Sequence, residues 1–251
     1  MWQANPVFTG VWRGLLAPEA GTAQRSYFGC LLVQAAALAL WWPKSSLVDA
    51  LASEQAPEPL LAAVVALGLT TAYYSLRAGA EEFLLSGQQS LREWALSTPL
   101  SVGRIVRGGL FGHLMHTLYL LVFSFPLLCV AFTEGGGEWS ALAQSLCTVV
   151  FQALFFWLAG AVVYLWIGQH GHATYLAIRL LLVSVYLLTA LRLPATSQPM
   201  VSVASLGADT YTISFGVASP PYQVFLLVHA VMIAILVIVL YAQLQRWRKL
   251  G

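Results

Sequence analysis

The sequence predicts an all-α membrane protein with six transmembrane helices, and three observations lead to this prediction. Of the 251 residues, 59% are hydrophobic and only 9% are charged, whereas about a quarter of the residues of a soluble domain are charged. The mean hydropathy is +0.76. The apolar residues also gather into six runs that are suited to crossing the roughly 30 Å hydrocarbon core of a bilayer as helices. We therefore expect residues 1–251 to form a single transmembrane domain.

The apolar runs set the bounds of the expected spans. In chain order these are Tyr27–Trp42, Leu60–Leu76, Ile105–Phe132, Trp139–Ile167, Ala173–Leu191 and Tyr222–Leu244. The first is short, whereas the third and fourth are long enough to tilt in the bilayer. Pro126 lies near the far end of the third span and should kink it, because proline removes a helical hydrogen bond.

Two further segments are expected at the membrane surface. Residues 1–25 lack the charged start and compact apolar core of a cleavable signal peptide, and their tryptophan, phenylalanine and leucine side chains favour an interfacial segment. Residues 194–221 form the longest expected extracytoplasmic loop. Polar and apolar residues alternate there around Gly207 and Asp209, which favours a small hairpin, with a partly re-entrant cap as the alternative.

The distribution of basic residues predicts the orientation, because cytoplasmic loops of membrane proteins retain lysine and arginine. With both termini in the cytoplasm, only Lys44 and Arg192 of the 12 lysines and arginines lie outside. The same orientation places the polar segment between the second and third spans in the cytoplasm. The basic residues are dispersed along the chain, so we expect no nucleic-acid partner.

That cytoplasmic segment, 80–101, has the sequence AEEFLLSGQQSLREWALSTPLS and predicts an amphipathic helix over Ala80–Ser97. One face carries Leu84, Gly87, Leu91, Trp94, Ala95 and Thr98, and the other carries Gln88, Gln89, Arg92, Glu93 and Ser97. Pro99 should end the helix, because proline disfavours the helical conformation of the residue before it. Such a helix could dock another protein or rest on the membrane surface.

Polar residues recur at helical spacing in two of the expected spans. Thr70, Tyr74, Arg77 and Glu81 share one face of the second span, and Arg179, Tyr186 and Thr189 share one face of the fifth. Polar faces within a membrane indicate a protein interface or an aqueous path, since contact with lipid would be costly. Ordinary hydrogen bonding between helices, with the arginines extended to the headgroups, is the alternative.

Several kinds of site are not expected. Neither of the two lysines, Lys44 and Lys249, closes a glycine-rich loop of the kind that binds nucleotide phosphates. His113 and His116 share a helix face but have no Cys, Asp or Glu at helical spacing beside them, so we expect hydrogen bonds to neighbouring helices or contacts with lipid headgroups, and no metal site. Nor is a catalytic nucleophile paired with a base in the membrane, so the chain is not expected to be an enzyme by itself.

Residues 90–101, SLREWALSTPLS, carry the most specific motif. Glu93 is followed by three apolar residues, 94–96, and then by the run Ser-Thr-Pro-Leu-Ser at 97–101. This stretch resembles a cytoplasmic pattern in the transmembrane subunits of ATP-binding-cassette transporters of the type-2 permease class. The chain departs from that pattern at 90–92, where Ser, Leu and Arg replace glycine, threonine and leucine. Asn5-Pro6, Phe125-Pro126-Leu127 and Gly135–Gly137 add to the resemblance.

The resemblance implies the exporter-like type-2 permease fold, with residues 80–101 as a coupling helix that docks on a separate ATPase subunit. The residues expected at that contact are Glu82, Gln88, Gln89, Arg92, Glu93, Trp94, Ser97, Thr98 and Pro99. The residues expected along a central path are Thr70, Tyr74, Arg77, Arg179, Tyr186 and Thr189. ATP and Mg²⁺ would bind to the partner ATPase, and this chain would hold no cofactor.

The resemblance also implies where the chain works and with what. We expect a multi-pass protein of the prokaryotic cytoplasmic (inner) membrane that pairs with a second permease copy or a paralogue. The expected function is the permease subunit of an ATP-driven exporter. The alternative is a subunit that transports nothing and transmits ATP-driven motion to an extracytoplasmic protein assembly, which the 194–221 loop could contact.

Overall fold

The computed structural model describes residues 5–16, 21–40, 59–82, 89–135, 139–167 and 221–250, together with Leu176 and Leu180. Throughout these residues the regular structure is helical, which confirms the predicted all-α class. The helices are α1 (Pro6–Leu16), α2 (Gly21–Leu40), α4 (Pro59–Gly79), α5 (Leu91–Ser97), α6 (Val102–Gly135), α7 (Trp139–Ile167) and α10 (Pro221–Leu250).

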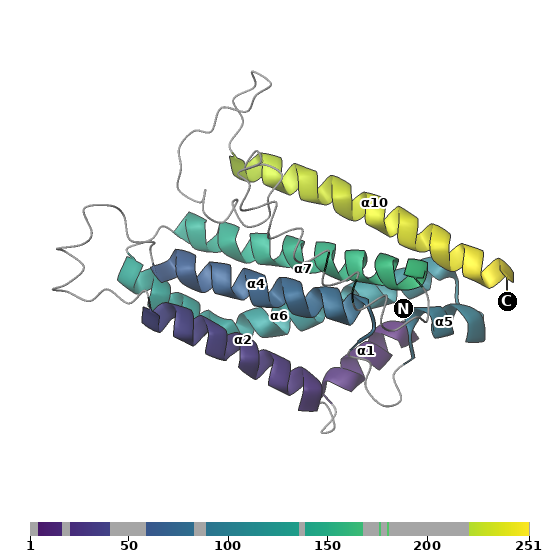
Figure 1. Ribbon diagram of the computed structural model, residues 1–251, viewed down its shortest axis with the longest axis horizontal. Coiled ribbons are helices and arrows are strands. Elements are labelled where there is room, and N and C mark those ends of the chain that lie inside the picture. The colour runs from purple at the N-terminus through teal and green to yellow at the C-terminus, as the bar shows by residue number, and fades with distance from the viewer. Residues whose placement is uncertain are drawn as a thin grey trace, which may run out of the picture.

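The long helices α2, α4, α6, α7 and α10 run lengthwise through an elongated bundle, and the short helices α1 and α5 lie at one end of it (Figure 1). Helix α4 packs against α2, α6 and α7, whereas α10 packs against α7, α6 and α5. The C-terminal end of α10 therefore lies at the same end of the bundle as α5. This arrangement brings the last residues of the chain close to residues near position 95.

Three helices in the described part of the chain are long and apolar enough to cross a membrane. They are Val102–Thr133 in α6, Leu142–Ile167 in α7 and Leu226–Leu250 in α10, at the positions predicted for the third, fourth and sixth spans. Helices α2 and α4 form where the first two spans were predicted, and α2 contains a shorter apolar stretch, Tyr27–Leu40. Apart from Leu176 and Leu180, the predicted fifth span lies outside the described residues, as do residues 194–220 with their expected hairpin.

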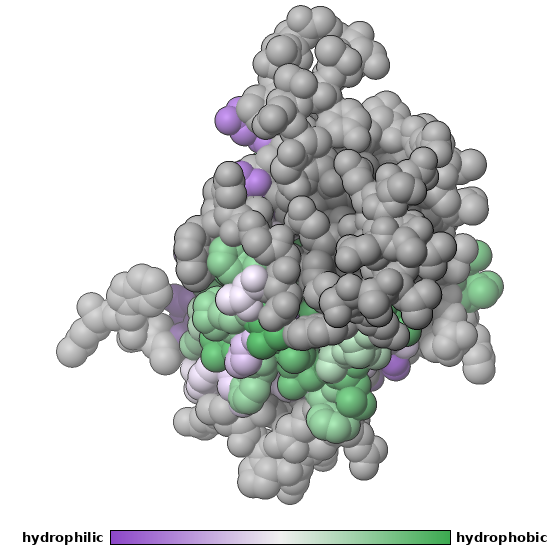
Figure 2. Space-filling model, turned by 90° about the vertical axis from the view of Figure 1, so that its left-hand side faces the viewer, coloured by the Kyte–Doolittle hydropathy of each residue, from purple (hydrophilic) through white to green (hydrophobic). Residues whose placement is uncertain are grey.

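The exposed surface agrees with burial in an apolar solvent. Viewed from the end opposite α5, the described residues are largely hydrophobic (Figure 2). Helix α10 exposes Leu227, Val231, Ile235 and Ile238, whose side chains are each more than half accessible. Lipid tails can contact such a face without cost, whereas water cannot.

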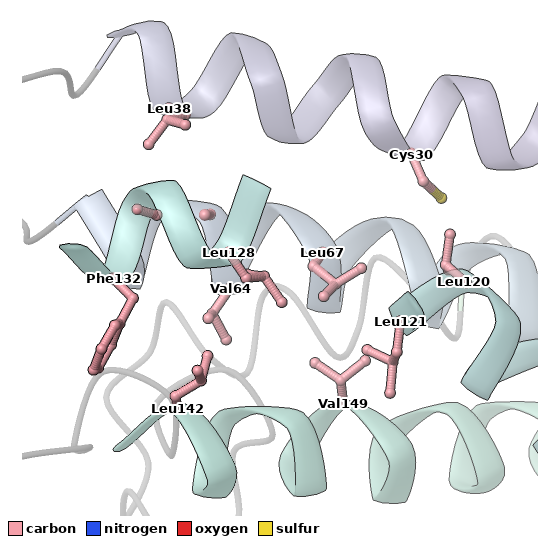
Figure 3. Close-up of a cluster of buried hydrophobic side chains, with 12 residues drawn as sticks. Cys30, Leu38, Val64, Leu67, Leu120, Leu121, Leu128, Phe132, Leu142 and Val149 are labelled. Carbon is pink, nitrogen blue, oxygen red and sulfur yellow. The ribbon is translucent and has the colours of Figure 1, made fainter. Parts of the chain in front are cut away.

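Two large buried clusters hold the bundle together, and a smaller third cluster joins the C-terminal half of α4 to α7. The first joins α2, α4, α6 and α7 in the half far from α5 (Figure 3). Its labelled members are Cys30 and Leu38 of α2, Val64 and Leu67 of α4, Leu120, Leu121, Leu128 and Phe132 of α6, and Leu142 and Val149 of α7. The second cluster lies at the α5 end and draws on α1, α5, α6, α7 and α10. It forms the base on which α5 rests.

Helix α1 confirms a helix within the predicted interfacial segment and is fixed to α6. The Asn5 side chain accepts a hydrogen bond from the Val7 amide at 3.1 Å and donates one to the Arg104 carbonyl at 2.7 Å. Pro6 then occupies the first helical position, where its missing N–H is no loss. Gly108 and Gly112 of α6 lie against α1, since a β-carbon at either would come within 2.7 Å of Val7 or Val11.

The predicted hydrogen bonds of the two span-three histidines are confirmed. His113 Nε2 lies 3.1 Å from Ser75 Oγ of α4, and His116 Nδ1 lies 2.6 Å from the Tyr27 hydroxyl of α2. In the other half of the bundle, Gln34 of α2 donates to Ser124 of α6 at 3.0 Å. Buried polar groups in a membrane must find partners within the protein, so these bonds fix α2 and α4 against α6.

Helices α4 and α7 make their closest approach at two glycines. A β-carbon on Gly79 would lie 1.9 Å from the Trp157 carbonyl oxygen, and one on Gly160 would lie 2.1 Å from the Leu76 carbonyl oxygen. The two backbones can therefore meet only because neither position carries a side chain. This contact sits at the last residue of α4, next to the link to α5.

Replacing Gly79 with alanine should force α4 and α7 apart. We expect the G79A variant to lose about 1–3 kcal/mol of unfolding free energy, the usual cost of overpacking. The thermal unfolding midpoint in detergent, followed by circular dichroism, measures this loss. Gly10 is the matched control, because a β-carbon there would meet nothing within 4 Å. Equal midpoints for G79A and G10A would contradict the close contact.

Candidate functional site

The predicted helix over Ala80–Ser97 is wrong in its extent. Helix α4 ends at Gly79, residues 80–82 form a turn, and α5 begins only at Leu91 and has seven residues. Glu81 has a φ of 60°, in the left-handed region that breaks a right-handed helix. Residues 83–88, including Gln88, lie outside the described residues. Among its described residues, the polar segment therefore contains a turn at 80–82, which we call the elbow, and the short helix α5.

The start of α5 is set by a capping box. Ser90 Oγ accepts a hydrogen bond from the Glu93 amide at 3.0 Å, and the Ser90 amide donates to Glu93 Oε2 at 2.9 Å. These two bonds satisfy amides that have no partner within the helix. The sequence signal for this helix start is Ser-x-x-Glu, present as SLRE at 90–93. The expectation that the helix begins at Ala80 did not take this signal into account. Glu93 therefore has a local structural task, independent of any partner.

The predicted end of α5 at Pro99 is confirmed. Thr98 is extended, with φ −121° and ψ 151°, as a residue before proline usually is. The Ser97 hydroxyl donates to the Glu93 carbonyl at 2.6 Å, and the Thr98 hydroxyl donates to the Trp94 carbonyl at 2.5 Å. Both hydroxyl groups thus bond to the last turn of their own helix.

The two faces of α5 differ in exposure, as the amphipathic pattern predicted for this part of the segment. Leu91 and Ala95 are buried, at 9% and 1% exposure, and pack in the cluster with Val102 and Leu244. Trp94 is partly buried against the same cluster. The exposed residues of the segment include Gln89, Glu93, Leu96, Ser97 and Pro99, and we call these five the outer face. Leu96 is 47% exposed and was not singled out by the sequence pattern.

The C-terminal end of α10 holds the other end of α5. The Arg248 guanidinium donates hydrogen bonds to the carbonyls of Ala95 at 3.1 Å, Thr98 at 3.1 Å and Leu100 at 2.5 Å. The Arg92 guanidinium lies 4.0 Å above the Trp247 ring, a cation–π contact. Nothing in the local sequence predicted these bonds, because about 150 residues separate the partners.

Glu81 connects the elbow to the first amide of α5. Its Oε1 accepts a hydrogen bond from the Leu91 amide at 2.7 Å. Burial raises the pKa of the Glu81 carboxyl from 4.5 to about 7, and the nearby Glu93 carboxylate adds to the rise. The Leu91 amide and the hydroxyls of Ser90 and Tyr164 lower this pKa but do not outweigh burial. Glu81 therefore changes charge near neutral pH.

The remaining residues predicted to contact an ATPase subunit lie in two places, the turn at 80–82 and α5 with its flanking residues. Glu82 forms an ion pair with Arg77 at 2.5 Å, and the Arg77 guanidinium also donates to the Tyr73 hydroxyl at 2.9 Å. Gln89 is exposed just before the helix, and Arg92 lies against Trp247. The structure thus gathers Gln89, Arg92, Glu93, Trp94, Ser97, Thr98 and Pro99 on α5 and the residues that flank it, whereas Glu82 lies in the turn after α4.

The predicted path residues are only partly described. Thr70 donates to the carbonyls of Ala66 and Leu67 at 2.8 and 3.1 Å, within its own helix. Tyr74 packs against the first buried cluster, and its hydroxyl lies beside Gly29 of α2. Glu81 does not extend this stripe, because α4 ends at Gly79. Arg179, Tyr186 and Thr189 lie outside the described residues.

Comparison with known proteins leaves the family open. The chain matches no protein-family model, no curated protein and no solved structure. Among the described residues, no group of three or more His, Cys, Asp and Glu side chains is arranged to hold a metal ion. The outer face of α5 and the contacts that hold this helix are therefore the candidate functional site.

The pH dependence of stability tests the burial of Glu81. Its folded-state pKa lies above its unfolded value, so it favours the folded state fully below about pH 4.5 and ceases to do so as pH rises through about 7. We expect the wild type to lose stability relative to E81Q between pH 5 and pH 8, so that the difference between their unfolding midpoints changes over this range. The control is E82Q, which removes the neighbouring carboxylate and should keep the wild-type trend. Identical pH profiles for wild type and E81Q would contradict the assignment.

Proposed function

We propose that this chain is the membrane permease subunit of an ATP-driven exporter, and that the outer face of α5 docks on a separate ATPase subunit. The observation that carries the proposal is that one face of α5 is buried and the other is exposed. One face is fixed to α6, α7 and α10, whereas the other leaves Gln89, Glu93, Leu96, Ser97 and Pro99 exposed. Because α5 packs against several long helices, a partner that displaces α5 would displace those helices with it.

The local stability of α5 supports this role. An isolated helix of seven residues does not persist in water. Here the capping box, the buried Leu91 and Ala95 and the bonds from Arg248 hold it. A preformed element loses little conformational entropy when a partner binds. Leu96, surrounded by polar residues, has the character of an anchor at the centre of a protein contact.

The proposal assigns the chemistry to the partner. ATP and Mg²⁺ would bind to the ATPase subunit, and this chain would pair with a second copy of itself or a paralogue in a prokaryotic cytoplasmic membrane. Both termini would lie in the cytoplasm, on the same side as α5. Substrate would pass between the subunits along Thr70, Tyr74 and Arg77 of α4 together with Arg179, Tyr186 and Thr189.

One observation favours the alternative, in which the chain transports nothing and passes motion to an extracytoplasmic assembly. The polar groups of the α4 stripe are engaged within the protein, Thr70 with carbonyls of its own helix and Arg77 with Glu82 and Tyr73. Such groups contribute to helix packing without lining a path. The ATPase contact at α5 is the same in both functions.

The first test concerns Leu96. Tagged wild-type protein from its native membrane should co-purify with a subunit that hydrolyses ATP, and L96D should weaken that association about tenfold or more, since it places a charge in a desolvated contact. L250D is the matched control, because Leu250 is 72% exposed and lies outside α5. Retention of the ATPase by L96D, or the absence of ATPase activity from the wild-type preparation, would defeat the proposal.

The second test separates the structural task of Glu93 from a charge contact with the partner. Glutamine can replace glutamate in a capping box, whereas alanine cannot. We expect E93A to lose about 1 kcal/mol of helix stability and ATPase association with it, while E93Q keeps both. Hydrogen exchange of residues 91–97 and recovery of the ATPase measure the two effects. Loss of association in E93Q, with exchange unchanged, would show that the charge itself contacts the partner.

A further inference from the structure

We propose that α5 is a strut between α4 and α10, held at one end by Glu81 and at the other by Arg248, so that α10 moves with α5. This inference concerns coupling within the chain and does not depend on the identity of the partner. It makes Arg248 a positioning residue, since it acts on the outer face through the backbone of α5. It also adds α10 to the two helices, α4 and α6, that the chain connects directly to α5.

Arg248 holds the C-terminal end of α5 through three hydrogen bonds. One guanidinium bonds three carbonyls, those of Ala95, Thr98 and Leu100, and so holds both the last turn of the helix and the Pro99 link to α6. Guanidinium is suited to this task because it carries several N–H donors in a fixed plane. Leu244 and Leu240, one and two turns before Arg248 on α10, are fully buried in the cluster that receives Ala95.

The N-terminal end is held through the elbow. Glu81 accepts the Leu91 amide, the first of α5, and the unusual φ of Glu81 directs its side chain from the end of α4 to that amide. A non-glycine residue persists in this conformation only where its surroundings impose it. Here the backbone contact between Gly79 and Trp157 fixes the residue two positions earlier. The groups that face Glu81 from neighbouring elements are Ser90 and Glu93 on the α5 side and Tyr164 of α7.

The two holding residues lie at the C-terminal ends of α4 and α10, which both pack on α6 and α7 but differ in their third neighbour. Helix α4 packs against α2, α6 and α7, and α10 packs against α7, α6 and α5. Their ends approach the same short helix at the right of the bundle in Figure 1. The carboxylate at the N-terminus of α5 and the guanidinium at its C-terminus also match the partial charges of the helix ends. A displacement of α5 therefore pulls on both helices.

Hydrogen exchange of the purified chain in detergent tests the strut at both ends. If α5 is held as one body, R248A should speed exchange of the amides of residues 91–93 as well as those of 95–98 and Leu100, and E81A should speed exchange in the last two turns of α10, residues 243–250. We expect about fivefold or more in each case, the effect of losing a charge-assisted hydrogen bond. Faster exchange confined to the end that carries the substitution would overturn the proposal.

Two further variants keep the test decisive. Arg246 is exposed on the same helix, so R246A removes an equal charge and should leave exchange of residues 91–100 unchanged. R248K retains the charge but not the planar set of donors, and should give an effect close to that of R248A. If R248A fails to fold, R248K provides the measurement. An R248K chain with wild-type exchange would contradict a role for the three carbonyl bonds. Because the ATPase is absent from this experiment, its result is separate from that of the L96D test.

Discussion

The backbone contact between α4 and α7 determines the arrangement of the helices at the α5 end of the bundle. Gly79 meets the Trp157 carbonyl and Gly160 meets the Leu76 carbonyl, so the two helices cross with no side chain between them. Trp157 extends the effect, because its ring and the Leu91 side chain both lie against Gly109 of α6, and the ring stacks on His113 with a centroid separation of 5.6 Å. The end of α4, the start of α5 and the first turns of α6 are thereby fixed around one residue of α7.

The short helix α5 depends on this frame. With seven residues it has too few internal hydrogen bonds to be stable alone. Its capping box, its buried face and the bonds from Arg248 supply what the helix lacks, and each comes from a different level of structure. This number of stabilising contacts on so short a helix is consistent with the proposal that α5 transmits motion from a partner. Glu81, in contrast, lowers the stability of the fold, because its carboxyl is buried with a raised pKa and its backbone is in the left-handed region.

Several features of the candidate site could be predicted from sequence, and others could not. The apolar runs predicted the positions of α6, α7 and α10, and Pro99 predicted the end of α5, since hydropathy and proline act locally. The spacing of Leu91 and Ala95 predicted that they share one face of the helix, but not that this face is buried against the rest of the chain. The start of α5 could have been found from Ser90 and Glu93, but an uninterrupted amphipathic pattern from Ala80 masked it. Periodicity records which residues would share a face if a helix formed, and it does not show where the backbone leaves the helix.

The sequence by itself determined the class of this protein: a helical chain with segments apolar enough to cross a membrane and a polar link in which Pro99 ends the helix. Composition, hydropathy and hydrogen bonds between near neighbours are sufficient for these properties. The tertiary structure alone decided that α4 ends at Gly79, that Glu81 reaches the first amide of α5, and that Arg248 holds its last carbonyls. These contacts follow from how the helices pack, and in the case of Arg248 and Ala95 they join residues 153 positions apart. A local pattern carries no information about such a pair.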